Sequence, residues 1–169
     1  MYNKILVIGC PGSGKSTFAR RLRDITGLPL YYLDMIWHKA DKTTVSQAEF
    51  DSRLDEILKN DNWIIDGNYK RTLEKRLEKC DTVFWLDYPA KLCLESIRAR
   101  IGKKREDMIW VETEIDEEFL EYVRNFNITQ RDVIIELFDK FKEKNIIVFH
   151  SREESEIFLN DLKECKKCR

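Results

Sequence analysis

The chain has 169 residues, which fits one domain better than two, because single domains usually contain roughly 100–200 residues. Hydrophobic residues make up 43% and charged residues 36% of the sequence, a balance that allows a buried core and excludes a disordered chain. Lys and Arg number 30 and Asp and Glu 31, so the net charge of −1 excludes a global positive field that would attract nucleic acid or anionic lipid.

The apolar runs have the length of strands and fall well short of the roughly 20 residues that cross a bilayer. We therefore expect no membrane segment, and the absence of a secretory pattern makes the cytoplasm the expected compartment. The five cysteines are scattered and odd in number, which predicts reduced thiols rather than a disulfide framework. Cys165 and Cys168 have metal-ligand spacing but lack a second pair, so a reduced tail is expected there.

Short segments rich in Ile, Val and aromatic residues alternate with longer segments of helical period. The predicted strands, in chain order, are Lys4–Ile8, Leu30–Leu33, Trp63–Ile65, Thr82–Leu86 and Ile146–Phe149. The predicted helices are Ser16–Ile25, Ser46–Leu58, Leu73–Leu77, Leu92–Ile101, Ile128–Phe141 and Glu154–Leu162. This alternation predicts an α/β fold with a mostly parallel sheet covered on both faces, in which ligands bind beyond the carboxyl ends of the strands.

Two helix starts have the pattern of a capping box, in which side chains satisfy the first free amides of the helix. Ser46 is followed by Glu49, and Ser151 is followed by Glu154. Both helices are therefore expected to begin directly after these serines.

The segment after the first predicted strand matches the phosphate-binding loop pattern of Gly, four residues and Gly-Lys-Ser/Thr. Its glycines permit a tight wrap of backbone amides around phosphate, and the following helix adds its positive end. Lys15 is expected to reach the β and γ phosphates, and Ser16 to ligate Mg²⁺, so ATP and Mg²⁺ are the predicted cofactors. The predicted nucleotide-binding residues are Gly9, Pro11, Gly12, Ser13, Gly14, Lys15, Ser16 and Thr17.

Cys10 lies within this loop, and its thiol has two interpretations. The loop amides could lower the thiol pKa, or Cys10 is a small side chain that the loop tolerates, which we favour because nothing in the motif requires a thiol.

Carboxylates follow two of the predicted strands. Asp66 ends the third, where a carboxylate beside the phosphate loop is the expected partner of hydrated Mg²⁺; the alternative is a turn formed by Asp66-Gly67. Asp34 ends the second and could orient an acceptor hydroxyl or take its proton; the alternative is a helix-capping Asp beside a packed Trp37.

Three further segments join the phosphate loop at Gly9–Thr17: Tyr32-Leu33-Asp34, Trp63–Tyr69 and Asp87-Tyr88-Pro89. With these residues the chain resembles the nucleoside-monophosphate-kinase-like branch of P-loop proteins. It more closely resembles the small adenylate-kinase-like proteins named DNA topology modulation proteins. The resemblance implies a three-layer αβα P-loop fold, a five-stranded parallel sheet in the order 2-3-1-4-5, and a short helical lid. It also implies one P-loop kinase-like domain over residues 1–169, with the lid at about 102–127.

The cations between Arg98 and Arg105, five in eight positions, form the expected lid. The resemblance implies that Arg100 and Arg105 neutralise the charge that spreads over the transferring phosphoryl group, with Gly102 as a hinge. The alternative is that these cations simply form a solvated surface, as charge runs usually do. The acidic residues at 106–107 and 112–121 are expected to form an exposed face or to pair with the lid cations.

The acceptor side is the least determined part of the expected site. Asn68 and Arg71 lie where adenylate kinases have Phe-Pro-Arg-Thr, and Arg76 is the next candidate, although a helix-surface arginine is often only solvated or ion-paired. With Asp34 and Trp37 they make up the predicted substrate-binding residues. The segment lacks the Thr-Gly and Arg by which adenylate kinases hold AMP, so the resemblance does not carry AMP over as the substrate.

These features predict an ATP-dependent kinase that transfers the γ-phosphoryl group to a small acceptor, a nucleotide or another metabolite, with Lys15, Arg100, Arg105 and Asp34 as catalytic residues. The alternative is an ATP-dependent nucleic-acid-associated regulator that modulates DNA topology. Its support is thin, because the sequence has no helix-turn-helix, zinc finger or basic stripe outside the lid. A purely structural nucleotide binder would not need the intact Lys15-Ser16 pair.

Overall fold

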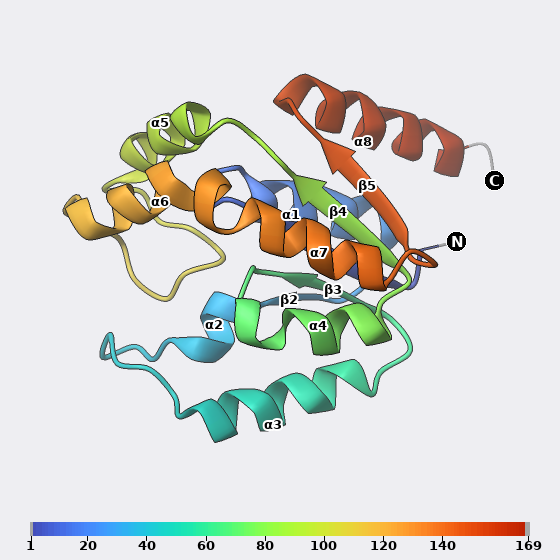
Figure 1. The fold of residues 1–169 in the computed structure, drawn as a ribbon, viewed down its shortest axis with the longest axis horizontal. Helices are drawn as coiled ribbons and strands as arrows, with labels where there is room; N and C mark the ends of the chain where they lie inside the picture. Colours follow the sequence, from blue (N-terminus) through green and yellow to red (C-terminus); the bar gives the residue numbers. More distant parts are fainter. Residues whose placement is uncertain (1, 168–169) are drawn as a thin grey trace.

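Five parallel strands form one sheet at the centre of the protein (Figure 1). The structure is a computed structural model that describes residues 2–167. The strand order is β2-β3-β1-β4-β5, as predicted. The strands are β1 Lys4–Gly9, β2 Leu30–Tyr32, β3 Trp63–Asp66, β4 Thr82–Leu86 and β5 Asn145–Phe149.

The predicted helices Leu73–Leu77 and Glu154–Leu162 are observed as the longer Lys70–Lys79 and Arg152–Lys167, and the larger differences are at two places. Leu33, predicted as the end of a strand, begins a five-residue helix, and the predicted helix Ile128–Phe141 is wrong in extent, because two helices meet at Gln130. The second part of the predicted lid is therefore helical from Glu117 onward. The helices are α1 Lys15–Thr26, α2 Leu33–Trp37, α3 Gln47–Leu58, α4 Lys70–Lys79, α5 Ala90–Arg100, α6 Glu117–Thr129, α7 Arg131–Lys140 and α8 Arg152–Lys167.

Two neighbouring aromatic residues of β4 show which helices cover each face of the sheet. Phe84 contacts Phe18 of α1 and Phe158 of α8, with ring centroids 5.3 and 5.1 Å away. Trp85 contacts Phe138 of α7 at 5.4 Å in an edge-on arrangement. Because successive strand residues point to opposite faces, α1 and α8 cover one face and α7 covers the other. This arrangement gives the three-layer αβα architecture that the alternating pattern predicts (Figure 1).

The predicted helix starts are confirmed at their serines. Ser46 Oγ accepts a hydrogen bond from the Glu49 amide at 3.1 Å, and Ser151 Oγ accepts one from the Glu154 amide at 3.2 Å. The Glu154 carboxylate accepts from the His150 amide at 2.7 Å, one residue before the position that a reciprocal capping box requires. The serine half of each motif therefore sets where α3 and α8 begin.

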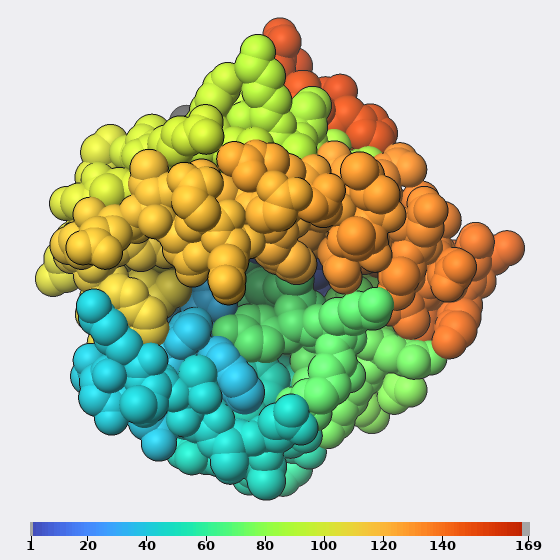
Figure 2. Space-filling view, turned by 60° about the vertical axis from the view of Figure 1, so that its left-hand side comes forward, coloured from blue at the N-terminus to red at the C-terminus, as the bar shows by residue number. Residues whose placement is uncertain are grey.

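Helix α6 packs against both α5 and α7, and α7 lies over a face of the sheet. In Figure 2 the orange α6 and α7 overhang a hollow whose opposite wall is formed by the cyan and green α2 to α4. Within residues 2–167, no helix combines the length and the apolar character needed to cross a bilayer. Cys10, Cys80, Cys93 and Cys165 are free thiols, and Cys168 lies outside the described residues.

Candidate active site

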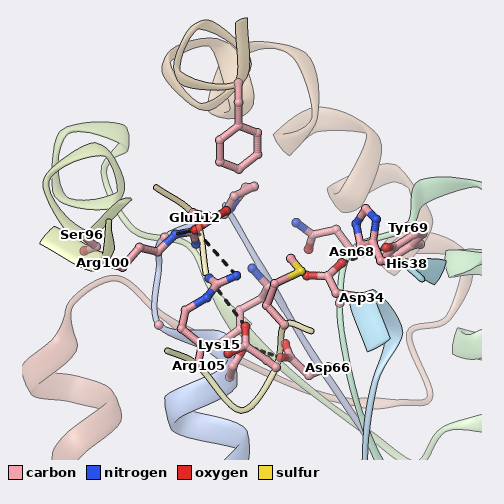
Figure 3. A pocket seen from close by; sticks show the side chains of 18 of the residues that line it. Lys15, Asp34, His38, Asp66, Asn68, Tyr69, Ser96, Arg100, Arg105 and Glu112 are labelled. Carbon is pink, nitrogen blue, oxygen red and sulfur yellow. Dashed lines mark hydrogen bonds and ion pairs between the residues drawn. The ribbon is translucent and has the colours of Figure 1, made fainter. Parts of the chain in front are cut away.

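A cavity of about 980 Å³ lies under the overhang of α6 and α7, beyond the carboxyl ends of the strands. Its volume is at the upper end of the range for small-molecule sites. Figure 3 shows Lys15 and Asp66 in the middle of the cavity. Arg100, Arg105 and Glu112 lie on one side of this pair, and Asp34 lies on the other. The cavity therefore brings together residues that the sequence places on five separate segments.

The phosphate loop passes so close to its neighbours that two positions accept only glycine. A Cβ on Gly12 would lie 2.3 Å from the Cys93 carbonyl oxygen of α5, and one on Gly9 would lie 2.5 Å from the Leu86 carbonyl oxygen of β4. Gly12 also has a φ of 83°, in the left-handed region that side chains disfavour. The loop is therefore built against β4 and α5 at van der Waals distance.

Hydrogen bonds hold the loop in its wrapped form. The Lys15 ammonium donates to the Cys10 carbonyl oxygen at 3.1 Å, and the Ser13 amide donates to the same oxygen at 3.0 Å. Helix α1 begins at Lys15, so its positive end faces the cavity, as the motif predicts. The Asn68 amide contacts both backbone groups of Gly9, accepting from its N–H at 3.0 Å and donating to its carbonyl oxygen.

Cys10 is 2% exposed, and its thiol lies 3.9 Å from the Val123 carbonyl oxygen. A hydrogen bond with Cys93 and burial raise the pKa of the Cys10 thiol. The raised pKa contradicts the interpretation of Cys10 as a reactive thiol and agrees with a small buried side chain.

Ser16 and Asp66 meet at the floor of the cavity. Ser16 Oγ donates to Asp66 Oδ2 at 2.5 Å, because the parallel pairing of β3 with β1 places Asp66 beside Val7, just before the loop. Asp66 is 5% exposed, and its Oδ1 has no partner among the described residues. Burial raises the pKa of Asp66 to about 6, against the opposing effect of Lys15. These oxygens are the hard ligands that Mg²⁺ prefers.

The two lid arginines predicted to act on phosphate point into the cavity and share one carboxylate. Arg100 makes two contacts with Glu112, from Nε to Oε2 at 2.8 Å and from NH2 to Oε1 at 2.9 Å. Arg105 NH2 lies 3.8 Å from Glu112 Oε2. Burial lowers the pKa of Arg100. Of the two alternatives for Glu112, an exposed acidic face or pairing with the cations of the predicted lid, the structure shows the second, because Glu112 is partly buried between the two arginines.

Asp107, also in the predicted lid, contacts the phosphate loop, which the sequence did not predict. Its Oδ2 lies 3.1 Å from Ser16 Oγ, and the residue is 7% exposed. Arg20 and Arg105 lie farther away, at 3.8 and 3.7 Å from its carboxylate oxygens. The sequence does place an acid directly after the cations of the predicted lid. It cannot show, however, that Asp107 is buried in the cavity whereas its neighbour Glu106 is exposed.

Asp34 lies in the first turn of α2 and lines the cavity opposite the lid. Its Oδ1 accepts a hydrogen bond from the Tyr69 hydroxyl at 2.8 Å (Figure 3). The cap position of α2 is Tyr32, so the helix-capping alternative for Asp34 is wrong. Tyr69 has a φ of 29°, an uncommon value for a residue with a side chain, and it too faces the cavity.

The two arginines predicted to contact the substrate lie outside the cavity lining. Arg76 is 0% exposed, and its guanidinium donates to the carbonyl oxygens of Gly67 at 2.8 Å and Thr72 at 3.3 Å. It also donates to the carbonyl oxygens of the two residues after Gly67, which makes it a structural residue of the β3–α4 connection. Arg71 is exposed and forms a two-pronged ion pair with Asp51 of α3 at 2.8 and 2.6 Å. Both predictions of substrate contact are therefore corrected.

Trp37 and Asn68 also have different roles from the predicted ones. Trp37 packs edge-on against Phe50 at 5.6 Å and Tyr69 at 6.2 Å, and it does not contribute to the cavity lining. Asn68 lines the cavity, but its side-chain amide is occupied by the backbone of Gly9. Trp37 therefore packs behind Tyr69, and Asn68 joins the end of β3 to the phosphate loop.

Comparison with known proteins gives relatives of one functional type. No protein-family model matches the chain. An adenylate kinase from Thermosipho africanus is 28% identical over 131 residues, which cover 73% of this chain and 59% of that protein. An adenylate kinase from Thermotoga maritima is 31% identical over 88 residues, or 50% of this chain and 39% of that protein. The chain thus spans less than two thirds of the length of these curated relatives.

Solved structures show the same fold over the whole chain. Shikimate kinase from Acinetobacter baumannii, in complex with shikimate, has a TM-score of 0.62 at 15% identity and covers 98% of this chain and 96% of its own. Shikimate kinase from Bacteroides thetaiotaomicron has a TM-score of 0.56 at 16% identity, covering 99% of both chains. With its phosphate loop and its 2-3-1-4-5 sheet, the chain has the fold of P-loop kinases, and its sequence is similar to that of adenylate kinases, which supports a nucleoside-monophosphate-kinase-like family.

Proposed function

We propose that this protein is an ATP-dependent phosphotransferase that transfers the γ-phosphoryl group of ATP, with Mg²⁺, to a small-molecule acceptor. One observation carries the proposal: the phosphate-loop lysine, a Ser–Asp pair, two lid arginines and a carboxylate on the far wall all face the same cavity. The names of the relatives, adenylate kinase and shikimate kinase, support phosphotransfer to a small molecule.

The nucleotide half of the cavity provides the groups that phosphoryl transfer needs. The loop amides and Lys15 would hold the β and γ phosphates, and Ser16 with Asp66 would hold Mg²⁺, which neutralises charge on the transferring group. Mg²⁺ fits there because the buried Asp66 Oδ1 has no partner among the described residues. Arg100 and Arg105 contact Glu112 in this structure, and phosphate oxygens would take the place of that carboxylate when nucleotide binds. A segment of about residues 102–127 would act as the lid.

The acceptor half supports a hydroxyl group, rather than a phosphate, as the group that receives the phosphoryl. A phosphate acceptor needs cations, ideally the planar fork of arginine, but Arg71 and Arg76 are both engaged elsewhere. In the part of the cavity lining contributed by residues 34–73, the cations are Lys42 and Lys70. A carboxylate such as Asp34 would repel a phosphate but can orient a hydroxyl and accept its proton as transfer proceeds.

Tyr69 would hold Asp34 in place for this role. The hydrogen bond from its hydroxyl fixes one oxygen of the carboxylate, so the other oxygen stays available to an acceptor hydroxyl. The proposed substrate class is therefore a small hydroxyl compound, in which a second, anionic group would lie within reach of Lys42 or Lys70.

The proposal is tested by measuring ADP formation from Mg·ATP with matched sets of hydroxyl metabolites and nucleoside monophosphates. Asp34→Asn should lower kcat about 100-fold or more, the range for loss of a general base, while the thermal shift caused by Mg·ADP is kept. Lys15→Ala should abolish that shift.

No ADP above background with any acceptor would refute the phosphotransferase proposal. Phosphorylation of a nucleoside monophosphate that is unaffected by Asp34→Asn would refute the hydroxyl class. Salt-dependent binding of duplex DNA that disappears when Lys103 and Lys104 are neutralised would instead support the nucleic-acid-associated alternative.

A further inference from the structure

Two carboxylates from distant segments converge on a single hydroxyl group at the cavity floor. Ser16 Oγ lies 2.5 Å from Asp66 Oδ2 and 3.1 Å from Asp107 Oδ2. A serine hydroxyl has one proton, so it can donate to one of these oxygens but not to both. Asp66 and Asp107 are only 5% and 7% exposed, so water cannot fully hydrogen-bond the carboxylate that Ser16 does not reach.

The positive groups nearby, Lys15 included, make no direct hydrogen bond to this pair of carboxylates, since Lys15 donates to the Cys10 carbonyl oxygen. Arg20 and Arg105 lie 3.8 and 3.7 Å from Asp107, well beyond the 2.7–2.9 Å of a direct charge-assisted hydrogen bond. Asp66 Oδ1 is buried and has no partner among the described residues. Burying two carboxylates in this way is unfavourable unless a cation or further donors complete the site.

From this geometry we infer that Asp107 is a metal ligand carried by the lid, which completes a divalent-cation site with Ser16 and Asp66, directly or through one water. The inference rests on the proposed function only in placing Mg²⁺ beside the phosphate loop. Within residues 2–167 no three His, Cys, Asp or Glu side chains are grouped as metal ligands. The proposed site has two carboxylates, and Mg²⁺ is usually held by one or two carboxylates, waters and substrate phosphates.

A cation at this position would link the lid to the sheet. Asp66 is fixed at the end of β3, whereas Asp107 lies in the loop between α5 and α6. That loop turns at Gly102, which has a φ of 75° and donates its amide to the Glu112 carbonyl oxygen at 2.8 Å. Because Arg105 is only two residues before Asp107, metal binding would also set this arginine over the phosphate position.

The test measures binding of Mn²⁺, a paramagnetic substitute for Mg²⁺, to the full chain by titration with electron paramagnetic resonance. Asp107→Asn should weaken Mn²⁺ binding about 10- to 100-fold, the usual loss for a supporting group at a metal site. Glu106→Gln is the matched control, because Glu106 is the adjacent lid acid but pairs with Arg23 at 2.7 Å and does not contact Ser16. Its Mn²⁺ affinity should be unchanged.

Hydrogen exchange gives a second readout that does not depend on activity. Without nucleotide, Mn²⁺ should slow exchange of the amides of residues 101–116 in the wild type and in Glu106→Gln, but not in Asp107→Asn. Unchanged Mn²⁺ affinity in Asp107→Asn, or an equal loss in Glu106→Gln, would overturn the inference. Retained ATP turnover with unchanged Mn²⁺ affinity in Asp107→Asn would refute this inference alone, whereas absence of turnover in the wild type would refute the proposed function.

Discussion

Replacement of Asp66 by Asn is expected to raise the stability of the metal-free protein at neutral pH. Burial raises the pKa of this carboxyl to about 6 from an ordinary value of 3.8. Each pKa unit corresponds to about 1.36 kcal/mol, so the ionised carboxylate lowers the free energy of unfolding by about 3 kcal/mol above pH 7. Asn has the same shape, and its carbonyl oxygen can still accept the hydrogen bond from Ser16.

The pH dependence follows from the sign of the shift. Below about pH 3.8 the carboxyl is protonated in both the folded and the unfolded protein, so it contributes no difference in stability. Between about 3.8 and 6 the folded protein binds more protons, and the wild type loses stability as the pH rises. The advantage of Asp66→Asn should therefore be about half its full size at pH 5 and should reach about 3 kcal/mol at pH 8.

Urea unfolding in EDTA at pH 5, 6, 7 and 8 measures this advantage directly. Asp34→Asn is the control, because it removes a carboxylate from the same cavity at a half-buried position that keeps its contact with Tyr69. Mg·ATP should stabilise the wild type and not Asp66→Asn, because ligands that bind only the folded state stabilise it. An advantage that is absent at pH 8, or of equal size at pH 5 and pH 8, would refute the reasoning.

Three other changes test the placement of individual residues. Gly12→Ala should abolish the thermal shift caused by Mg·ADP, because its Cβ would lie 2.3 Å from the Cys93 carbonyl oxygen and its φ is 83°. Gly14→Ala has only the backbone strain of its φ of 94° and meets no atom within 4 Å, so it should lose less of the shift. Arg76→Met should lower the free energy of unfolding by at least about 3 kcal/mol in urea, since several buried carbonyl groups lose their donor. Arg71→Ala should leave both the urea midpoint and ADP formation unchanged, which a direct substrate contact would not allow.

The sequence predicted those features best in which the residue types themselves determine the local backbone structure. The order of strands and helices follows from short apolar runs, and the phosphate loop follows from glycines and a lysine at fixed offsets. Asp66 was found because the end of a buried strand beside the loop is a defined place in space. The helix α2 was missed because Leu33 continues an apolar run in sequence, but it leaves the sheet to pack under Gly67.

The arginines of α4 show what a sequence alone could not resolve. From the sequence, Arg71 and Arg76 were both candidates for substrate contact. In the structure Arg71 is exposed, whereas Arg76 has no exposed surface. The difference arises at Tyr69, whose φ of 29° turns the chain so that several carbonyl groups face the guanidinium of Arg76. A backbone conformation of this kind depends on tertiary packing, because it is unfavourable for a residue with a side chain.

The predicted lid combines groups of opposite charge, and the proposed phosphoryl transfer would use both. Its arginines suit phosphate, but Glu112 already occupies Arg100 with two short contacts, so an incoming phosphate must displace a carboxylate rather than water. This exchange would reduce nucleotide affinity, while Arg100 stays aimed into the cavity. Asp107 is not engaged in this way, because its arginine contacts are longer than its contact with Ser16. Under the proposed function, Glu112 would orient a cation for the phosphates, and Asp107 would present an anion to the metal beside them.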